Sequence, residues 1–219
     1  MKSEITQSKE RLAILIRHGE SEGNAGLATD TPQDIPLTLL GRQQAQKLAS
    51  SWSIKPDLIV TSPFIRAKQT AEPMVSRFKH LRVEEWPIGE FTYLTPADWH
   101  GSTSKDRQAA VTRYWQRSDP TYNDGAGAES FVDLIDRVEK VIGLLRDENS
   151  HTALLFTHEQ FMKAFLWCLR TDARRISNLR SFKNFSDSFK IPNCGSFEVR
   201  IGANGGIAFD QRDNVFEAA

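Results

Sequence analysis

The segment that decides the fold reads Arg11-Leu12-Ala13-Ile14-Leu15-Ile16-Arg17-His18-Gly19. Its apolar run is continuous and stops abruptly at His18. A strand with one solvated face alternates apolar and polar residues, whereas a strand buried on both faces is apolar throughout. The segment therefore predicts a doubly buried strand with polar side chains at its carboxyl end.

Three further segments have the character of strands: residues 57–61, 81–86 and 152–157, the last of which also stops at a histidine, His158. In an open parallel sheet, ligands bind outside the carboxyl ends of the strands. We therefore expect four side chains to meet at that edge: Arg17, His18, Arg66 and His158.

Apolar residues at helical spacing predict helices between the strands. The first helix is expected from the capping residue Thr38 to about Trp52, where the spaced apolar residues are Leu39, Leu40, Ala45, Leu48 and Ala49. The second carries Arg66, with Pro63 in its first turn and an interruption near Pro73. A third begins at residue 131, and its spaced apolar residues are Phe131, Leu134, Ile135, Val138, Val141, Ile142 and Leu145.

Alternating strands and helices predict an α/β fold of three layers, α/β/α, with a mostly parallel central sheet. Residues 91–128 break the alternation, with Gly, Pro, Asp and aromatic residues around one expected helix at about 103–117. We predict a single domain over residues 1–219, with 91–128 as a helical insertion over the active site.

Composition excludes several classes of partner. The chain has 28 basic and 28 acidic residues, so no net charge draws it to nucleic acid or to an anionic membrane. No apolar run approaches the roughly 20 residues of a membrane span. Two cysteines, Cys168 and Cys194, and an opening without a signal core predict a cytoplasmic protein. The five histidines lack the spacing of metal ligands, so we expect no metal and no cofactor.

The residues at the first strand end suit phosphoryl transfer. A neutral imidazole such as His18 can attack phosphorus if its other ring nitrogen donates to a fixed acceptor. The guanidinium forks of Arg17 and Arg66 can bind the equatorial phosphate oxygens in bidentate fashion. A lone histidine at a strand end is more often structural, so the interpretation depends on the motif around it.

That motif, Arg17-His18-Gly19-Glu20-Ser21 with Asn24, resembles the signature of the histidine phosphatase superfamily, also called phosphoglycerate mutase-like. Other segments agree in chain order. They are 61–71 around Arg66, Ala128-Glu129-Ser130 leading into Arg137-Val138, and Phe156-Thr157-His158. The resemblance spans about 11–170 and implies a catalytic His18, with phosphate bound by Arg17, Asn24, Arg66 and His158.

The resemblance also implies a general acid at Glu90, because an alkoxide leaves poorly without a proton. The segment after Glu90 departs from the family pattern, so Glu20, Glu129 and Glu159 remain alternative acids. Relatives commonly carry glycine where this chain has Glu159. We expect residue 159 to begin a helix, with its amide facing the anion and its side chain turned away.

Three hypotheses of function follow. The first is a phosphomonoesterase that forms a phosphohistidine on His18, and the second is a phosphoglycerate mutase-type phosphotransferase. Mutase relatives hold a carboxylate with paired arginines in the insertion, where this chain offers Gln116-Arg117, which disfavours the second. The third is a non-catalytic protein that binds a phosphorylated ligand. The substrate is a small phosphorylated molecule or a phosphoprotein, and the oligomeric state stays open.

Two aromatic groups and a basic segment have more than one interpretation. We expect Phe161, Phe165 and Trp167 in the core. The insertion aromatics Trp99, Tyr114 and Trp115 either cap the site or anchor the insertion. The basic segment 174–190 is expected to be an amphipathic helix with a solvated basic side, not a surface for nucleic acid or membrane. Its basic residues are Arg174, Arg175, Arg180, Lys183 and Lys190.

Overall fold

The central sheet has six strands in the order β3-β2-β4-β1-β6-β7. A computed structural model of the chain describes residues 10–170, 178–209 and 217–218. The strands of this sheet are β1 (Arg11–Arg17), β2 (Leu58–Thr61), β3 (Arg82–Glu85), β4 (Thr152–Thr157), β6 (Ser196–Ile201) and β7 (Ile207–Phe209). The four strands predicted from the sequence are all present and all parallel to one another, as β1–β4, β4–β2 and β2–β3 pairs.

β6 and β7 were not predicted, and both are antiparallel to their neighbours. β6 pairs with β1 so that Ile14 lies opposite Glu198, and it alternates buried Phe197 and Val199 with more exposed residues. This pattern is typical of a strand near a sheet edge with only one face covered. The sheet is therefore mixed but mostly parallel, as predicted.

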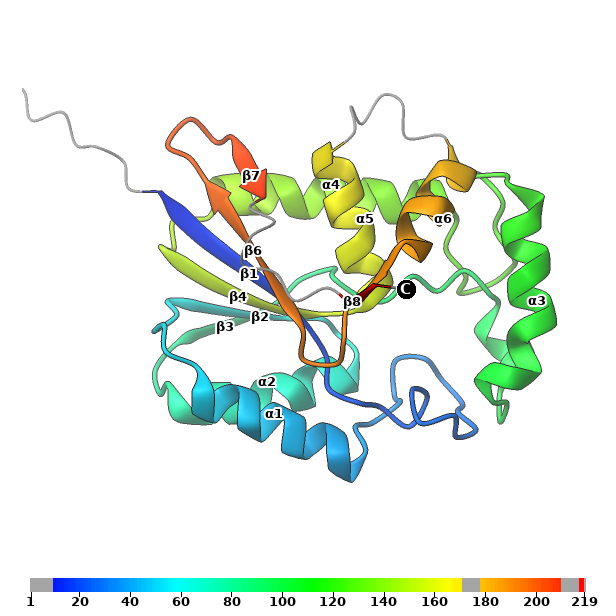
Figure 1. Cartoon of the computed structure of the whole chain (residues 1–219), viewed down its shortest axis with the longest axis horizontal. Helices are drawn as coiled ribbons and strands as arrows, with labels where there is room; N and C mark the ends of the chain where they lie inside the picture. The colour runs from blue at the N-terminus through cyan, green and yellow to red at the C-terminus, as the bar shows by residue number, and fades with distance from the viewer. Residues whose placement is uncertain (1–9, 171–177, 210–216, 219) are drawn as a thin grey trace, which may run out of the picture.

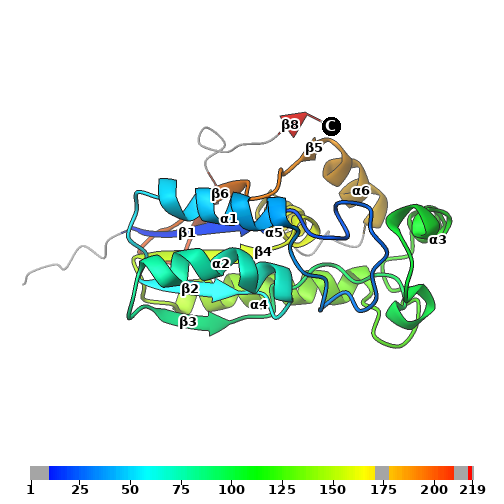
Figure 2. The ribbon, with the colours of Figure 1, turned by 90° about the horizontal axis from the view of Figure 1, so that it is seen from below.

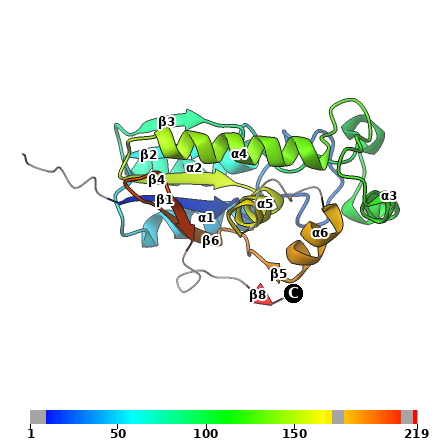
Figure 3. The ribbon, with the colours of Figure 1, turned by 90° about the horizontal axis from the view of Figure 1, so that it is seen from above.

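Helices cover both faces of the sheet (Figure 1). α1 (Leu39–Ser51) and α2 (Ile65–Arg77) lie on one face, and α4 (Phe131–Asp147) and α5 (Glu159–Arg170) lie on the other (Figure 3). Ile14 and Ile16 of β1 belong to the first apolar cluster, whereas Ala13 and Leu15 belong to the second. Successive strand residues point to opposite faces, which explains why β1 is apolar throughout. The predicted three-layer α/β/α fold is confirmed.

Three further helices lie beyond the carboxyl ends of the parallel strands (Figure 2). They are the 3-10 helix η1 (Pro96–Trp99), α3 (Ser104–Arg117) and α6 (Leu179–Asp187). A separate two-stranded sheet pairs β5 (Phe189–Lys190) with β8 (Glu217–Ala218). The segment 91–128 thus places α3 over the edge where the site was expected. The single-domain boundary of 1–219 stays a prediction.

Two details of the helices differ from expectation. Leu39 and Leu40 are 74% and 49% exposed, and the buried face of α1 is lined by small residues, Gly41, Ala45 and Ala49. α2 begins after Pro63 and continues through Pro73 without interruption. An internal proline costs about 3 kcal/mol, and here the flanking residues Ala67, Ala71 and Met74 are buried in the core, which offsets that cost.

The aromatic residues divide as follows. Phe161 and Phe165 are fully buried, and half-buried Trp167 packs against Phe182 and Phe185. In the insertion, Tyr114 and Trp115 lie in an aromatic cluster with Phe91 and Tyr93, so they anchor the insertion. Trp99 instead lines the cavity described below.

Within the basic segment, Leu179–Asp187 forms the amphipathic helix α6, which buries Leu179 and Phe182 and leaves Arg180 exposed. The expected helix does not reach Lys190, which lies in β5. Arg174, Arg175 and Ile176 lie outside the described residues. Among the helices that the structure describes, none is long and apolar enough to cross a membrane.

Candidate active site

His18 stands at the carboxyl end of β1 and is 2% exposed. Its Nδ1 lies 2.7 Å from the carbonyl oxygen of Gly19. Because a carbonyl can only accept, Nδ1 carries the proton and Nε2 keeps a lone pair. Burial, and next the Arg66 guanidinium, hold the pKa of His18 well below its usual value. His18 is therefore a neutral imidazole whose Nε2 can act as a nucleophile at neutral pH.

A close contact between two glycines fixes the loop after His18. A Cβ on Gly19 would lie 2.6 Å from the carbonyl oxygen of Gly41 in the first turn of α1, and a Cβ on Gly41 would lie 2.0 Å from the carbonyl oxygen of Glu20. Real Cβ atoms do not approach so closely, so only glycine fits at either position. This contact holds the Gly19 carbonyl that sets the His18 tautomer.

Arg66 extends from the first turn of α2 to His18. Its Nε donates to His18 Nε2 at 3.2 Å and its Nη1 donates to the Pro32 carbonyl at 2.6 Å. The side chain is buried, and burial lowers the pKa of Arg66 to about 10, so it stays charged at neutral pH. The structure thus brings the second predicted arginine into contact with His18 Nε2.

Arg17 is held from the side opposite the cavity. Its Nη1 forms an ion pair with Glu159 at 3.0 Å and donates to the Ile191 carbonyl at 2.5 Å. Glu159 also pairs with the buried Lys163 at 2.9 Å, and Lys163 donates to the Ser186 carbonyl. Residue 159 begins α5 as expected, and its carboxylate does not line the cavity. The carboxylate orients Arg17 and is compensated by two cations.

Asn24 lines the cavity next to His18. Its Oδ1 accepts from the Ser21 amide at 3.3 Å and from Asn193 Nδ2 at 3.1 Å. These bonds leave the Asn24 Nδ2 as a donor toward the cavity. Asn193 Nδ2 also donates to the His18 carbonyl at 3.0 Å. Sequence reasoning missed Asn193, because it follows α6 in a segment with no motif.

His158 lies beneath His18, with ring centroids 5.1 Å apart, and it is fully buried. Its Nε2 lies 2.8 Å from the Ser62 hydroxyl, whereas its Nδ1 has no partner among the described residues. Burial and the Arg66 charge hold the pKa of His158 well below its usual value. A buried polar atom without a partner is costly, and His158 itself does not line the cavity, so its binding of phosphate stays a prediction.

Glu90 forms the opposite wall of the cavity. Its Oε1 accepts from two backbone amides, Phe91 at 3.0 Å and Gln160 at 3.1 Å, and Oε2 has no partner among the described residues. Burial raises the pKa of Glu90, although the Arg66 charge opposes part of the shift. Since Oε1 is occupied as an acceptor, the proton of the acid form belongs on Oε2. That arrangement is what a general acid requires.

Arg137 fixes the segment that leads to Glu90. It forms a bidentate ion pair with Glu129 at 2.7 and 2.8 Å, and its Nη1 donates to the Pro87 and Gly89 carbonyls. Each of the other three candidate acids has a partner. Glu129 pairs with Arg137, and Glu159 pairs with Arg17 and Lys163. Glu20 accepts a hydrogen bond from the Thr38 hydroxyl at 2.7 Å.

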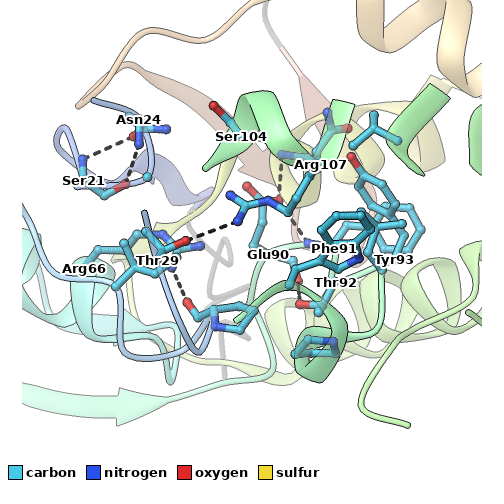
Figure 4. A pocket seen from close by; sticks show the side chains of 18 of the residues that line it. Ser21, Asn24, Thr29, Arg66, Glu90, Phe91, Thr92, Tyr93, Ser104 and Arg107 are labelled. Carbon is cyan, nitrogen blue, oxygen red and sulfur yellow. Dashed lines mark hydrogen bonds between the residues drawn. The ribbon is translucent and has the colours of Figure 1, made fainter. Parts of the chain in front are cut away.

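A cavity of about 460 Å³ joins these groups (Figure 4). Arg17, His18, Asn24, Arg66 and Glu90 line one part. The rest is lined by residues of the 91–128 segment, by residues between 21 and 35, and by Gln160. His158 lies behind this lining. Gln116 and Arg117 do not line the cavity, and Arg117 stacks on Tyr122 instead. Within the described ranges, no three His, Cys, Asp or Glu side chains are grouped to hold a metal ion.

Comparison with known proteins places this geometry in a family. The sequence model of the histidine phosphatase superfamily (branch 1) matches residues 13–202. An uncharacterized phosphatase PhoE of Bacillus subtilis is 40% identical over 129 residues, which are 57% of this chain and 58% of that protein. A glucosyl-3-phosphoglycerate phosphatase of Mycolicibacterium vanbaalenii is 33% identical over 135 residues, 58% of this chain and 56% of that protein. The chain thus matches less than two thirds of the length of these relatives.

Solved structures agree on the fold. One described as mycobacterial hydrolase 1 has a TM-score of 0.70 at 23% identity, and the match covers 96% of this chain and 100% of that one. A phosphoserine phosphatase mutant of Entamoeba histolytica has a TM-score of 0.68 at 23% identity, with coverage of 92% and 95%. With the family model spanning most of its length, the chain belongs to the histidine phosphatase superfamily, branch 1.

Proposed function

We propose that the protein is a phosphomonoesterase that acts through a phosphohistidine on His18. The observation that carries the proposal is the state of His18: its Nδ1 proton is bound by the Gly19 carbonyl, and its Nε2 lone pair faces the Arg66 guanidinium at 3.2 Å. A phosphate bound at this point would contact both a neutral nucleophile and a buried cation.

In the first step, His18 Nε2 attacks phosphorus, the bond from phosphorus to the ester oxygen breaks, and Glu90 Oε2 gives its proton to the departing oxygen. Arg17, Arg66, Asn24 and His158 bind the phosphoryl oxygens, on which charge is concentrated. In the second step, Glu90 takes a proton from water, whose oxygen attacks the phosphohistidine and releases inorganic phosphate with neutral His18.

A small phosphorylated substrate fits this site better than a phosphoprotein. The cavity of about 460 Å³ lies within the range of small-molecule sites. Relatives whose names give a substrate include a glucosyl-3-phosphoglycerate phosphatase and a phosphoserine phosphatase, both acting on small molecules. The mutase alternative is disfavoured because neither Gln116 nor Arg117 lines the cavity.

We also propose a cytoplasmic location, which the two free thiols, Cys168 and Cys194, support. Fractionation of cells that produce the protein would test it, and recovery in an oxidising compartment would contradict it.

The proposed activity is tested with a panel of phosphorylated metabolites and phosphopeptides, without added metal and with released phosphate as readout. His18→Ala is expected to abolish turnover, because the phosphoryl group loses its covalent acceptor. Labelled substrate quenched in base should leave acid-labile label on His18 of the wild type. Substantial turnover by His18→Ala would exclude the phosphohistidine mechanism, and transfer to a second hydroxyl instead of water would identify a mutase.

A further inference from the structure

Ser62 is a fully buried residue beside the site, and the proposed chemistry gives it no part. It follows Thr61, the last residue of β2, and its amide donates to the Phe156 carbonyl of β4 at 3.0 Å. β2 and β4 are parallel neighbours, so their carboxyl ends lie side by side. Ser62 after β2 and His158 after β4 therefore meet at this edge, and both are 0% exposed.

The Ser62 hydroxyl has two partners among the described residues. It accepts from the Phe64 amide at 3.1 Å, and it lies 2.8 Å from His158 Nε2. A hydroxyl has one proton to donate and two lone pairs with which to accept. Because the Phe64 amide uses one lone pair, His158 Nε2 takes either the hydroxyl proton or the second lone pair.

One of these two arrangements satisfies every group. If His158 Nε2 carried a proton and donated it to Ser62, the hydroxyl proton of Ser62 would be buried with no acceptor in the described part of the chain. A buried donor without an acceptor costs free energy. If Nε2 instead accepts the hydroxyl proton, both hydrogen bonds of Ser62 are complete. Nε2 then keeps its lone pair, and the proton of the neutral imidazole must be on Nδ1.

The other ring nitrogen of His158 is thereby a donor. His158 Nδ1 is buried and has no partner within the described ranges. The His158 ring lies against the ring of His18, with centroids 5.1 Å apart, and the Phe64 ring packs edge-on against it at 5.0 Å. An ionised phosphoryl oxygen can only accept, so a neutral His158 with its proton on Nε2 could not bind one through Nδ1.

We propose that Ser62 is a positioning residue, which holds His158 in the neutral tautomer with the proton on Nδ1 and so makes it a hydrogen-bond donor for the phosphoryl group. This inference rests on the proposed function, in which His158 binds a phosphoryl oxygen. A neutral donor adds no second positive charge next to the buried Arg66 guanidinium, which would oppose it.

The first test is the tautomer itself. Long-range proton–nitrogen correlation spectra of histidine-labelled protein separate an Nδ1–H imidazole from an Nε2–H imidazole, and His158→Gln assigns the signals. Wild type should show a neutral His158 with its proton on Nδ1. Ser62→Ala should shift His158 toward the Nε2–H tautomer, because Nε2 loses its donor. An Nε2–H tautomer in wild type, or an unchanged tautomer in Ser62→Ala, would overturn the proposal.

Kinetics test whether the tautomer matters for turnover. Ser62→Ala should lower kcat/KM for phosphate release by roughly 2- to 12-fold, the range for one neutral hydrogen bond. Added to His158→Ala, it should cause no further loss, because the donor that Ser62 fixes is then absent. An equal loss in both backgrounds would mean that Ser62 does not act through His158, and the proposal would be wrong.

Ser130→Ala is a matched control. The Ser130 hydroxyl is also buried and forms two hydrogen bonds, both with Asp133 in the first turn of α4. This variant should lower Tm but leave the His158 tautomer and kcat/KM unchanged. If it lowers kcat/KM as much as Ser62→Ala does, the loss reflects stability and not the state of His158, which would contradict the inference.

Binding of inorganic phosphate gives a readout that does not depend on turnover. Phosphate should bind Ser62→Ala roughly 2- to 12-fold more weakly than wild type, and calorimetry measures the difference. If no ester is hydrolysed, the proposed function fails, while the tautomer and phosphate binding still decide the role of Ser62. Equal phosphate binding by the two proteins would exclude that role.

Discussion

The ion pair of Glu159 with Lys163 allows a quantitative prediction of stability. Glu159 is one fifth exposed, and its carboxylate lies between Arg17 at 3.0 Å and Lys163 at 2.9 Å. Lys163 is only 4% exposed. Glu159→Gln removes the carboxylate partner of the buried Lys163 ammonium, which keeps the Ser186 carbonyl at 2.8 Å as an acceptor. Breaking a buried pair by removing one partner costs about 3 to 5 kcal/mol.

We expect the lower end, about 3 kcal/mol, because the glutamine oxygen can still accept one hydrogen bond and the site is partly solvated. For a chain of this size, that loss lowers Tm by about 6 to 12 °C. The measurement is urea and thermal unfolding of wild type, Glu159→Gln, Lys163→Met and the double variant. The double variant should be more stable than Glu159→Gln alone, because it contains no uncompensated ammonium.

A matched control lies on α6, where Lys183 and Asp187 form an exposed pair at the same i, i+4 spacing. Asp187→Asn should cost less than about 0.5 kcal/mol, the usual scale of an exposed helical pair. If Glu159→Gln costs no more than Asp187→Asn, then burial does not decide the energetics of the Glu159 pair and the reasoning is wrong.

Further predictions concern catalysis. Arg66→Ala and His158→Ala should each raise the activation free energy for kcat/KM by roughly 2 to 4 kcal/mol. Arg66→Lys should recover part of this loss. If either alanine variant keeps the wild-type kcat/KM, that residue does not bind the phosphate. Glu90→Gln should slow alkyl phosphates severely, but p-nitrophenyl phosphate should still give a burst of phenolate. An equal loss of burst rate on both substrates would contradict the acid role. Because the pKa of Glu90 is raised and its acid form is needed, kcat/KM should fall as pH rises through that pKa. This alkaline limb should be absent in Glu90→Gln, and its persistence there would assign it to another group.

Much of the fold could be predicted because β1 and β4 are buried on both faces and therefore apolar without interruption. The capping residues Thr38, Thr103 and Ser130 likewise mark where α1, α3 and α4 begin. The prediction that Leu39 and Leu40 lie on the buried face of α1 was wrong, because packing overrides local preference there. Leu39 and Leu40 are exposed, because α1 approaches the His18 loop so closely that only the small side of the helix can face it.

The part of the candidate site that lies at the carboxyl ends of the parallel strands could be predicted from the sequence. His18 and Asn24, Arg66, and Glu90 converge on one cavity from three different segments, and His158 lies close to His18. Asn193 carries no local signal, because it contacts His18 and Asn24, which lie far away in the sequence. Such residues could be found only once the tertiary structure had brought the segments together.

The contact between Arg66 and His18 links binding to reactivity in the proposed mechanism. Without ligand, Arg66 Nε donates to the same Nε2 lone pair that must attack phosphorus. A lone pair shared with a cation is a weak nucleophile. A bound phosphate is a stronger acceptor for the guanidinium than a neutral imidazole, so its arrival draws Arg66 from Nε2 to the phosphoryl oxygens. In the proposed mechanism, this exchange frees the Nε2 lone pair of His18 once phosphorus is in place. In the proposed mechanism, Arg66 therefore controls when His18 Nε2 is free to react and also stabilises charge on the phosphoryl group. A lysine, with its single nitrogen, cannot reproduce both effects.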